Sequence, residues 1–217
     1  MNRIKHLVIK DIKAEWRTGS NLGGLTIYSI STVFLCYRAF SAGISDRMWL
    51  VLLWLSLLFS SAFMAVDLFR HESGLGRLFY YSLVKPHEIY IGKWITAVLF
   101  QTFILTLTFS GFSLFFGIKS LNIWLFIAVL WLSGIAVTGI FTLSSAVASK
   151  SEKSGGLTAV LGLPLMVPVL MVSLQLAELV QQNLIQGSFF RLFLTLTGLS
   201  ILPVFLGAGL FSYLWHD

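Results

Sequence analysis

The charged residues that could contact another protein are concentrated between positions 65 and 94, in the sequence AVDLFRHESGLGRLFYYSLVKPHEIYIGKW. The stretch carries Arg70, Glu72, Gly74, Gly76, Arg77, Lys85, Pro86 and Lys93. Such a loop cannot lie in hydrocarbon, because one Lys or Arg at the centre of a spanning helix costs about 2.5 to 3.5 kcal/mol on insertion scales. We expect a short helix along a water-facing end of the protein, where a soluble partner can push on it.

Catalytic and metal-binding patterns are missing from the sequence. It has no G-x-x-x-x-G-K-[ST] phosphate loop, no H-E-x-x-H or G-x-S-x-G motif and no paired carboxylates. A single cysteine, Cys36, excludes an intramolecular disulfide and a cysteine-based metal cluster. We therefore expect no enzyme activity and no metal or cofactor bound by this chain, so that any energy it uses comes from another subunit.

The composition is that of an all-α integral membrane protein. Hydrophobic residues make up 57% of the chain and charged residues 11%, whereas a soluble domain has about 25% charged residues. The formal net charge is +6, but the basic residues are scattered between apolar runs and form no continuous patch. We therefore expect them to meet the anionic surface of a lipid bilayer and not a nucleic acid.

A basic amphipathic helix is predicted over residues 3 to 17. Its apolar side chains recur every four residues, at Ile4, Val8, Ile12 and Trp16. A helix of this kind lies in the membrane interface with its apolar face toward the acyl chains. The alternative is an ordinary cytoplasmic tail helix.

Six apolar segments follow, each near the roughly 20 residues that span a bilayer. They cover residues 22 to 40, 48 to 66, 94 to 117, 123 to 148, 157 to 177 and 192 to 214. The last two contain Pro164, Pro168 and Pro203, which we expect to shape these helices through kinks and close contacts. The expected architecture is thus six spans with an N-terminal interfacial helix and a cytoplasmic coupling helix between spans two and three.

The orientation follows from the distribution of Lys and Arg. With the N-terminus inside, 11 of the 15 basic residues fall on the inner side and 4 on the outer side. Both termini and the loops 67 to 93 and 149 to 156 are therefore predicted to be cytoplasmic.

The central stretch and two later motifs carry a family resemblance. LFR at 68 to 70 is followed by Glu72, by Gly-Arg-Leu at 76 to 78, and by Pro86 and Lys93 before the third span. The fourth loop reads SKSEKSGG and leads into LTAVLGLPLMVPVLM, with two prolines. In these features the chain resembles the permeases of ABC-2-type transporters, and more narrowly the haem exporter protein B family, the permease subunits of the cytochrome c maturation system.

The resemblance implies one permease domain over residues 1 to 217, in the inner membrane of a bacterium. Two copies would sit on two copies of a separate ATPase, which binds ATP and Mg²⁺, and the complex would handle haem together with a Trp-rich membrane subunit and a haem chaperone. Closure of the ATPase on ATP would move the coupling helix and drive release of the haem-loaded chaperone or haem export. The residues expected at that contact are Arg70, Glu72, Gly74, Gly76, Arg77 and Pro86.

Two other functions fit the same sequence. One is a generic ABC-2 efflux permease for a drug, lipid or polysaccharide, and the other is a scaffold that anchors a membrane assembly without transport. In the second case the loop is a solvated linker that tolerates substitution.

Overall fold

The computed structural model describes residues 2–40, 43–66, 68–69, 85–118, 120, 122–149, 154–185 and 187–214. Within these residues the regular structure is entirely helical, as predicted. The helices are α1 (Asn2–Thr18), α2 (Ser20–Ala39), α3 (Asp46–Val66), α5 (Pro86–Phe116), α6 (Ile123–Ala148), α7 (Ser154–Gln181) and α8 (Gly187–Leu214). Five of them, α3, α5, α6, α7 and α8, are long and apolar enough to cross a membrane.

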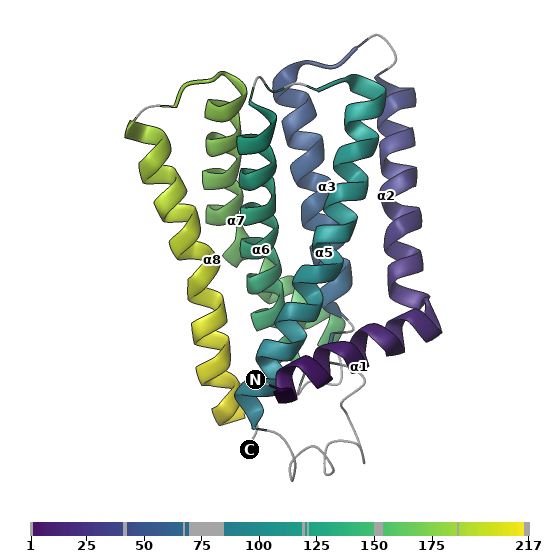
Figure 1. Cartoon of the computed structure of the whole chain (residues 1–217), viewed down its shortest axis with the longest axis vertical. Coiled ribbons are helices and arrows are strands. Elements are labelled where there is room, and N and C mark those ends of the chain that lie inside the picture. Colours follow the sequence, from purple (N-terminus) through teal and green to yellow (C-terminus); the bar gives the residue numbers. More distant parts are fainter. Residues whose placement is uncertain are drawn as a thin grey trace.

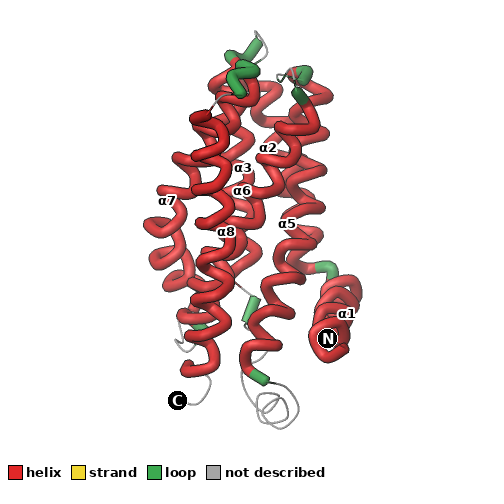
Figure 2. The backbone as a smooth tube through the Cα atoms, turned by 60° about the vertical axis from the view of Figure 1, so that its left-hand side comes forward, coloured by secondary structure: helices red, strands yellow, loops and turns green. Residues whose placement is uncertain are grey.

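The long helices form a bundle, and α1 lies across one end of it. Figures 1 and 2 show α2, α3 and α5 to α8 side by side, with α1 at a steep angle to them. We call this the α1 end; α3 and α6 finish there, and α5 and α7 begin there (Figure 1). Helix α2 runs alongside the other long helices, but its Ser, Thr, Asn and Gly residues make it less apolar. It is not among the five helices that are long and apolar enough to cross a membrane, so the six-span count remains a prediction.

Local sequence signals set the ends of two helices. Gly19 separates α1 from α2 with φ of 60°, a left-handed conformation that suits glycine. Its N–H donates to the carbonyl oxygen of Glu15 at 2.6 Å. Helix α6 follows Asn122, whose side chain accepts a hydrogen bond from the backbone N–H of Leu125 at 3.4 Å. These signals turn the chain from the α1 direction into the bundle and start its central helix.

Helix α5 begins eight residues earlier than the predicted start of the third span at residue 94. Pro86 occupies the first turn, where its missing N–H costs nothing. The backbone N–H of Lys85 donates to Glu88 Oε2 at 3.1 Å, which satisfies a donor at the helix start. The loop predicted at 67 to 93 therefore ends at Lys85, and the placement of Lys93 in that loop was wrong because this residue lies inside α5.

An aromatic cluster fills the core of the half of the bundle that is remote from the α1 end. Trp49 and Trp54 of α3 pack against Phe126 of α6, with ring centroids 5.6 and 6.0 Å apart. Phe112 of α5 stands edge-on to Trp49. Trp54 Nε1 donates to Ser173 Oγ of α7 at 2.7 Å, which satisfies its buried donor and joins α3 to α7. This half of the bundle is tightly packed and mainly apolar.

Helix α6 is the central element of the bundle. It packs against α3, α5, α7 and α8, and most of its side chains are buried. Its sequence alternates large apolar residues with Gly, Ala, Ser and Thr, so neighbouring helices approach closely. The long apolar run at 123 to 148 is therefore enclosed by protein on most sides.

The three predicted helix-shaping prolines lie inside helices. Pro164 and Pro168 are exposed on α7, and Pro203 is buried in α8. The hydroxyl of Tyr90 in α5 donates to the carbonyl oxygen of Pro203 at 3.1 Å. One turn further along α8, Gly207 faces the Tyr90 ring so closely that a Cβ added there would overlap the ring. Gly207 thus permits the contact between α5 and α8.

The Gly207 contact predicts a difference between two glycines of α8. Gly207→Ala forces the Tyr90 ring away from α8, and overpacking of this kind costs about 1 to 3 kcal/mol. Gly209→Ala is the matched control, because a Cβ there meets nothing within 4 Å. We expect thermal unfolding of the purified protein to show a lower Tm for Gly207→Ala only. Equal Tm values for the two variants would contradict this packing.

Candidate functional site at the α1 end

Five elements converge on a small apolar cluster at the α1 end. We call it the base cluster; its buried members are Leu7, Phe69, Ile89, Tyr90, Ala146 and Phe211. Phe69, just after α3, packs on Phe211 of α8 with ring centroids 5.4 Å apart. Tyr90 of α5 lies 6.0 Å from the same ring. The cluster therefore connects α1, α5, α6 and α8 with the residue that leads into the central loop.

An ion pair attaches α1 to α5 beside this cluster. Lys93 Nζ lies 3.1 Å from Asp11 Oδ2, and only 9% of the Lys93 side chain is exposed. Lys10 Nζ lies 3.2 Å from the other carboxylate oxygen of Asp11, but its side chain is 43% exposed. A buried ammonium group needs such a partner, since an isolated charge in this environment is very costly. The pair therefore fixes α1 in position on α5.

Close packing reinforces the ion pair. Leu7 of α1 lies over Gly92 of α5, where an added Cβ would stand 3.3 Å from Leu7 Cβ. Glu15 Oε1 accepts a hydrogen bond from the backbone N–H of Leu22 at 2.9 Å, which holds the junction between α1 and α2. Helix α1 is thus joined to the bundle at two points along its length.

Some of the predicted interfacial residues of α1 are buried or half-buried, and one is exposed. Val8 is buried, Ile4 and Ile12 are half-buried, and Trp16 is 82% exposed. The apolar stripe of α1 therefore faces α5 in part, while Trp16 stands outside the protein. The role of this helix at a lipid interface remains a prediction.

The coupling residues predicted from sequence lie mostly outside the described part of the chain. These are Arg70, Glu72, Gly74, Gly76 and Arg77. Pro86 is described and starts α5. The flanking residues lie at the α1 end, because Phe69 belongs to the base cluster and Lys85 is the N-cap of α5.

Sequence reasoning missed the contact between Asp11 and Lys93. A signal for it existed, because Asp11 follows Leu7 by four residues and Val8 by three and so shares the buried face of α1. An acidic residue on the apolar face of a basic helix indicates a buried cationic partner. The identity of that partner depends on the docking of α1, which the sequence does not specify.

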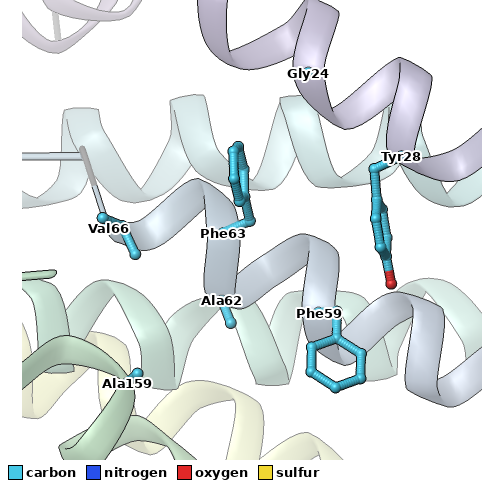
Figure 3. A pocket seen from close by; sticks show the side chains of 7 residues that line it. All are labelled: Gly24, Tyr28, Phe59, Ala62, Phe63, Val66 and Ala159. Atoms are coloured by element: carbon cyan, nitrogen blue, oxygen red, sulfur yellow. The ribbon is translucent and has the colours of Figure 1, made fainter. Parts of the chain in front are cut away.

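An apolar pocket of about 300 Å³ opens between α2, α3 and α7 (Figure 3). Its lining residues are Gly24, Tyr28, Phe59, Ala62, Phe63, Val66 and Ala159. The Tyr28 hydroxyl is the polar side-chain group among them. Such walls suit an acyl chain or another apolar group, but they offer no convergent polar groups for chemistry. In the described part of the chain, no three His, Cys, Asp or Glu residues are grouped to hold a metal ion.

The ion pair predicts unequal effects of two lysine substitutions. Lys93→Met leaves the Asp11 carboxylate without its buried partner, and we expect a loss of about 3 kcal/mol of unfolding free energy. The matched control Lys10→Met removes the more exposed partner of the same carboxylate and should cost under about 1 kcal/mol. Both are measured by thermal unfolding in one detergent.

A double variant checks the origin of that loss. Asp11→Leu with Lys93→Met removes both charges, so it should be more stable than Lys93→Met alone. A double variant that is less stable than Lys93→Met would show that the lysine acts through something other than this pair.

Comparison with known proteins fits this architecture. The sequence pattern of the family described as ABC-2 type transporter matches residues 2–168, from α1 to the second proline of α7. The comparison with curated proteins gives no match. The family match spans more than half of the chain and includes α1 and the start of α5, two of the elements at the α1 end. The chain therefore belongs to the ABC-2 type transporter family, as a transmembrane permease subunit of an ABC transporter.

Proposed function

We propose that the α1 end is where a separate ATP-binding cassette ATPase acts on this permease. Membership of the ABC-2 family implies pairing with such an ATPase, and this observation carries the proposal. The segment between Phe69 and Lys85 is the contact, and its two ends are anchored in the base cluster and in the first turn of α5. A push on it reaches α5 directly and reaches α1 through the pair of Asp11 and Lys93.

In this proposal α1 and the first turns of α5 move as one body. The ion pair and the contact of Leu7 with Gly92 hold α1 against α5. A helix that lay only on lipid would not be fixed to α5 in this way. The hydroxyl of Tyr90 then passes the displacement to α8 through Pro203. Motion driven by ATP therefore enters at one end and spreads along the helices that meet the base cluster.

The α1 end faces the cytoplasm in this proposal. The described basic residues at that end are Arg3, Lys5, Lys10, Lys13, Arg17, Lys85 and Lys93, and those at the other end are Arg38, Arg47 and Arg191. The excess of cations on one side supports the orientation. An ATPase acting there requires the same orientation, because ATP is cytoplasmic.

Thiol labelling tests this orientation. With Cys36→Ser as background, His87→Cys and Gln182→Cys place exposed thiols at opposite ends of the bundle. A membrane-impermeant reagent should label Gln182→Cys in intact cells, and label His87→Cys only after permeabilisation. The reverse pattern in intact cells would place the α1 end outside and remove the ATPase contact from it.

The cargo proposed for the complex is haem, delivered for assembly of c-type cytochromes. The support is the resemblance of the central loop, of SKSEKSGG and of the Gly-Leu-Pro-Leu-x-x-Pro run at 162 to 168 to the haem exporter protein B family. The proposed partners are a second copy of this chain, a Trp-rich haem-handling subunit and a haem chaperone, in a bacterial inner membrane. A generic efflux permease and a scaffold remain the alternatives.

A charge reversal in the loop tests the ATPase contact and the cargo separately. Glu72→Lys should reduce co-purification of the ATPase and the content of c-type cytochromes measured by haem staining, at unchanged membrane levels of this chain. Glu178→Lys is the control at the other end, where the carboxylate pairs at 3.0 Å with Arg47, whose side chain is 81% exposed; it should have little effect.

Two results would contradict parts of the proposal. Undiminished ATPase binding in Glu72→Lys would show that this position is not part of the contact. Lost ATPase binding with normal cytochromes would keep the contact and assign the permease to another cargo.

A further inference from the structure

Ten buried side-chain polar atoms have no hydrogen-bond partner among the described residues, and three of them belong to the mutually packed helices α3, α5 and α6 near the middle of the bundle. These three are Ser61 Oγ of α3, Gln101 Oε1 of α5 and Thr138 Oγ1 of α6. Each of these residues is at most 2% exposed. In a membrane no bulk solvent can satisfy such atoms, so each needs an explanation.

Contacts between the three helices lie within one turn of each of these residues. Gln101 Nε2 donates to Ser60 Oγ at 3.1 Å and approaches the Leu57 carbonyl oxygen at 3.4 Å, both on α3. On its other side, Gln101 Cγ lies 3.9 Å from a Cβ built on Gly134 of α6. Ser61 is one turn from Leu57, and Thr138 is one turn from Gly134, in the same direction along these parallel helices.

The Thr138 hydroxyl differs from three other buried hydroxyl groups of α5 and α6, which bond within their own helices. Thr108, Ser133 and Thr142 each donate to the carbonyl oxygen four residues earlier, at 2.7 to 2.8 Å. Thr138 does not, although it lies one turn before Thr142 on the same helix. The Thr138 hydroxyl can therefore form a hydrogen bond with a group outside its own helix.

Ser61 has a clear reason for not bonding within its own helix. The carbonyl oxygen four residues earlier belongs to Leu57, which already accepts from Ser60 Oγ at 2.9 Å and lies near Gln101 Nε2. The same oxygen also closes the helical ladder with the N–H of Ser61. Its two lone pairs are in use, so the Ser61 hydroxyl must find a partner elsewhere.

We infer that an ordered water molecule occupies this junction between α3, α5 and α6. A buried water typically makes about three hydrogen bonds to polar groups that would otherwise be unsatisfied. Here it donates to Gln101 Oε1 and accepts from the hydroxyls of Ser61 and Thr138. The side chains that supply these atoms are neutral, and this favours water over an ion.

The water changes how α5 can move. Its hydrogen bonds can be exchanged, whereas the aromatic rings at the far end of the bundle are closely packed against one another. Helix α5 can therefore shift against α3 and α6 at this level without leaving buried polar atoms unsatisfied. This consequence rests on the proposed function, but the water site itself does not.

Radiolytic labelling tests the water site directly. X-ray pulses produce hydroxyl radicals from water, and a buried side chain is oxidised when bound water lies beside it. In the full-length protein in lipid nanodiscs, mass spectrometry should find oxidation at Leu57 and Leu105, which both adjoin the junction. Leu196 of α8 is the control: it is an equally buried leucine on a helix that has no unpartnered buried side-chain atom among its described residues, so it should stay unlabelled.

Two variants show whether the labelling depends on the unpartnered atoms. Ser61→Ala with Thr138→Val removes two of the three and should reduce oxidation at Leu57 and Leu105 several-fold. Thr142→Val is the matched control, because its hydroxyl bonds within α6, and should leave the oxidation unchanged. Leu57 and Leu105 as unreactive as Leu196, or oxidation that persists in the double variant, would overturn the inference.

Thermal unfolding separates a hydrated junction from a dry one. If the junction is dry, Thr138→Val removes an unsatisfied hydroxyl at almost constant shape and raises Tm. If water is bound, the same change removes one of its partners, and we expect Tm to fall by about 2 to 4 °C. A rise in Tm would contradict the water site.

Discussion

The ion pair of Asp11 and Lys93 is the contact on which the arrangement of the α1 end depends. Without it, α1 would be a basic amphipathic helix able to lie anywhere on a lipid surface. With it, the helix has one fixed place, because a buried ammonium group in α5 requires the carboxylate. The contact of Leu7 with Gly92 follows from that docking, and so does the position of α1 beside the base cluster.

The two halves of the bundle are built differently. The half remote from α1 is packed with aromatic rings and joined by the hydrogen bond from Trp54 to Ser173. The half toward α1 holds close glycine contacts, as between Gly207 and Tyr90, and small hydroxyl side chains surround Gln101 at the middle of the bundle. Under the proposed function, this difference favours rearrangement in the half where the ATPase acts.

Hydropathy predicted most of the fold because membrane spans are long runs of apolar residues. The segment 123 to 148 coincides with α6, and the ends of α1 and α3 differ from prediction by at most two residues. The start of α5 was missed because Lys85 and Lys93 were taken as loop charges, although Pro86 and Glu88 are helix-start signals. As a result, Lys93 was not considered as a helical residue that could pair with an acidic side chain.

The contacts at the α1 end were harder to predict from the sequence. The pairing of Asp11 with Lys93 joins residues far apart in the chain, and the fit of Tyr90 against Gly207 depends on how two helices cross. Neither follows from periodicity or composition. The predicted loop residues from Arg70 to Arg77 remain predictions, since they lie outside the described part of the chain.

The most direct test of the account is a covalent link between α1 and α5. In a Cys36→Ser background, Leu7→Cys with Gly92→Cys places two sulfur-bearing side chains where the Cβ atoms stand 3.3 Å apart, near disulfide geometry. If α1 and the first turns of α5 move as one body, the disulfide forms readily, and the ATP hydrolysis rate of the complete complex is the same oxidised and reduced. A disulfide that abolishes hydrolysis until it is reduced would show that the two helices separate during the cycle, and one that does not form would show that Leu7 does not lie over Gly92. Either result would contradict the account.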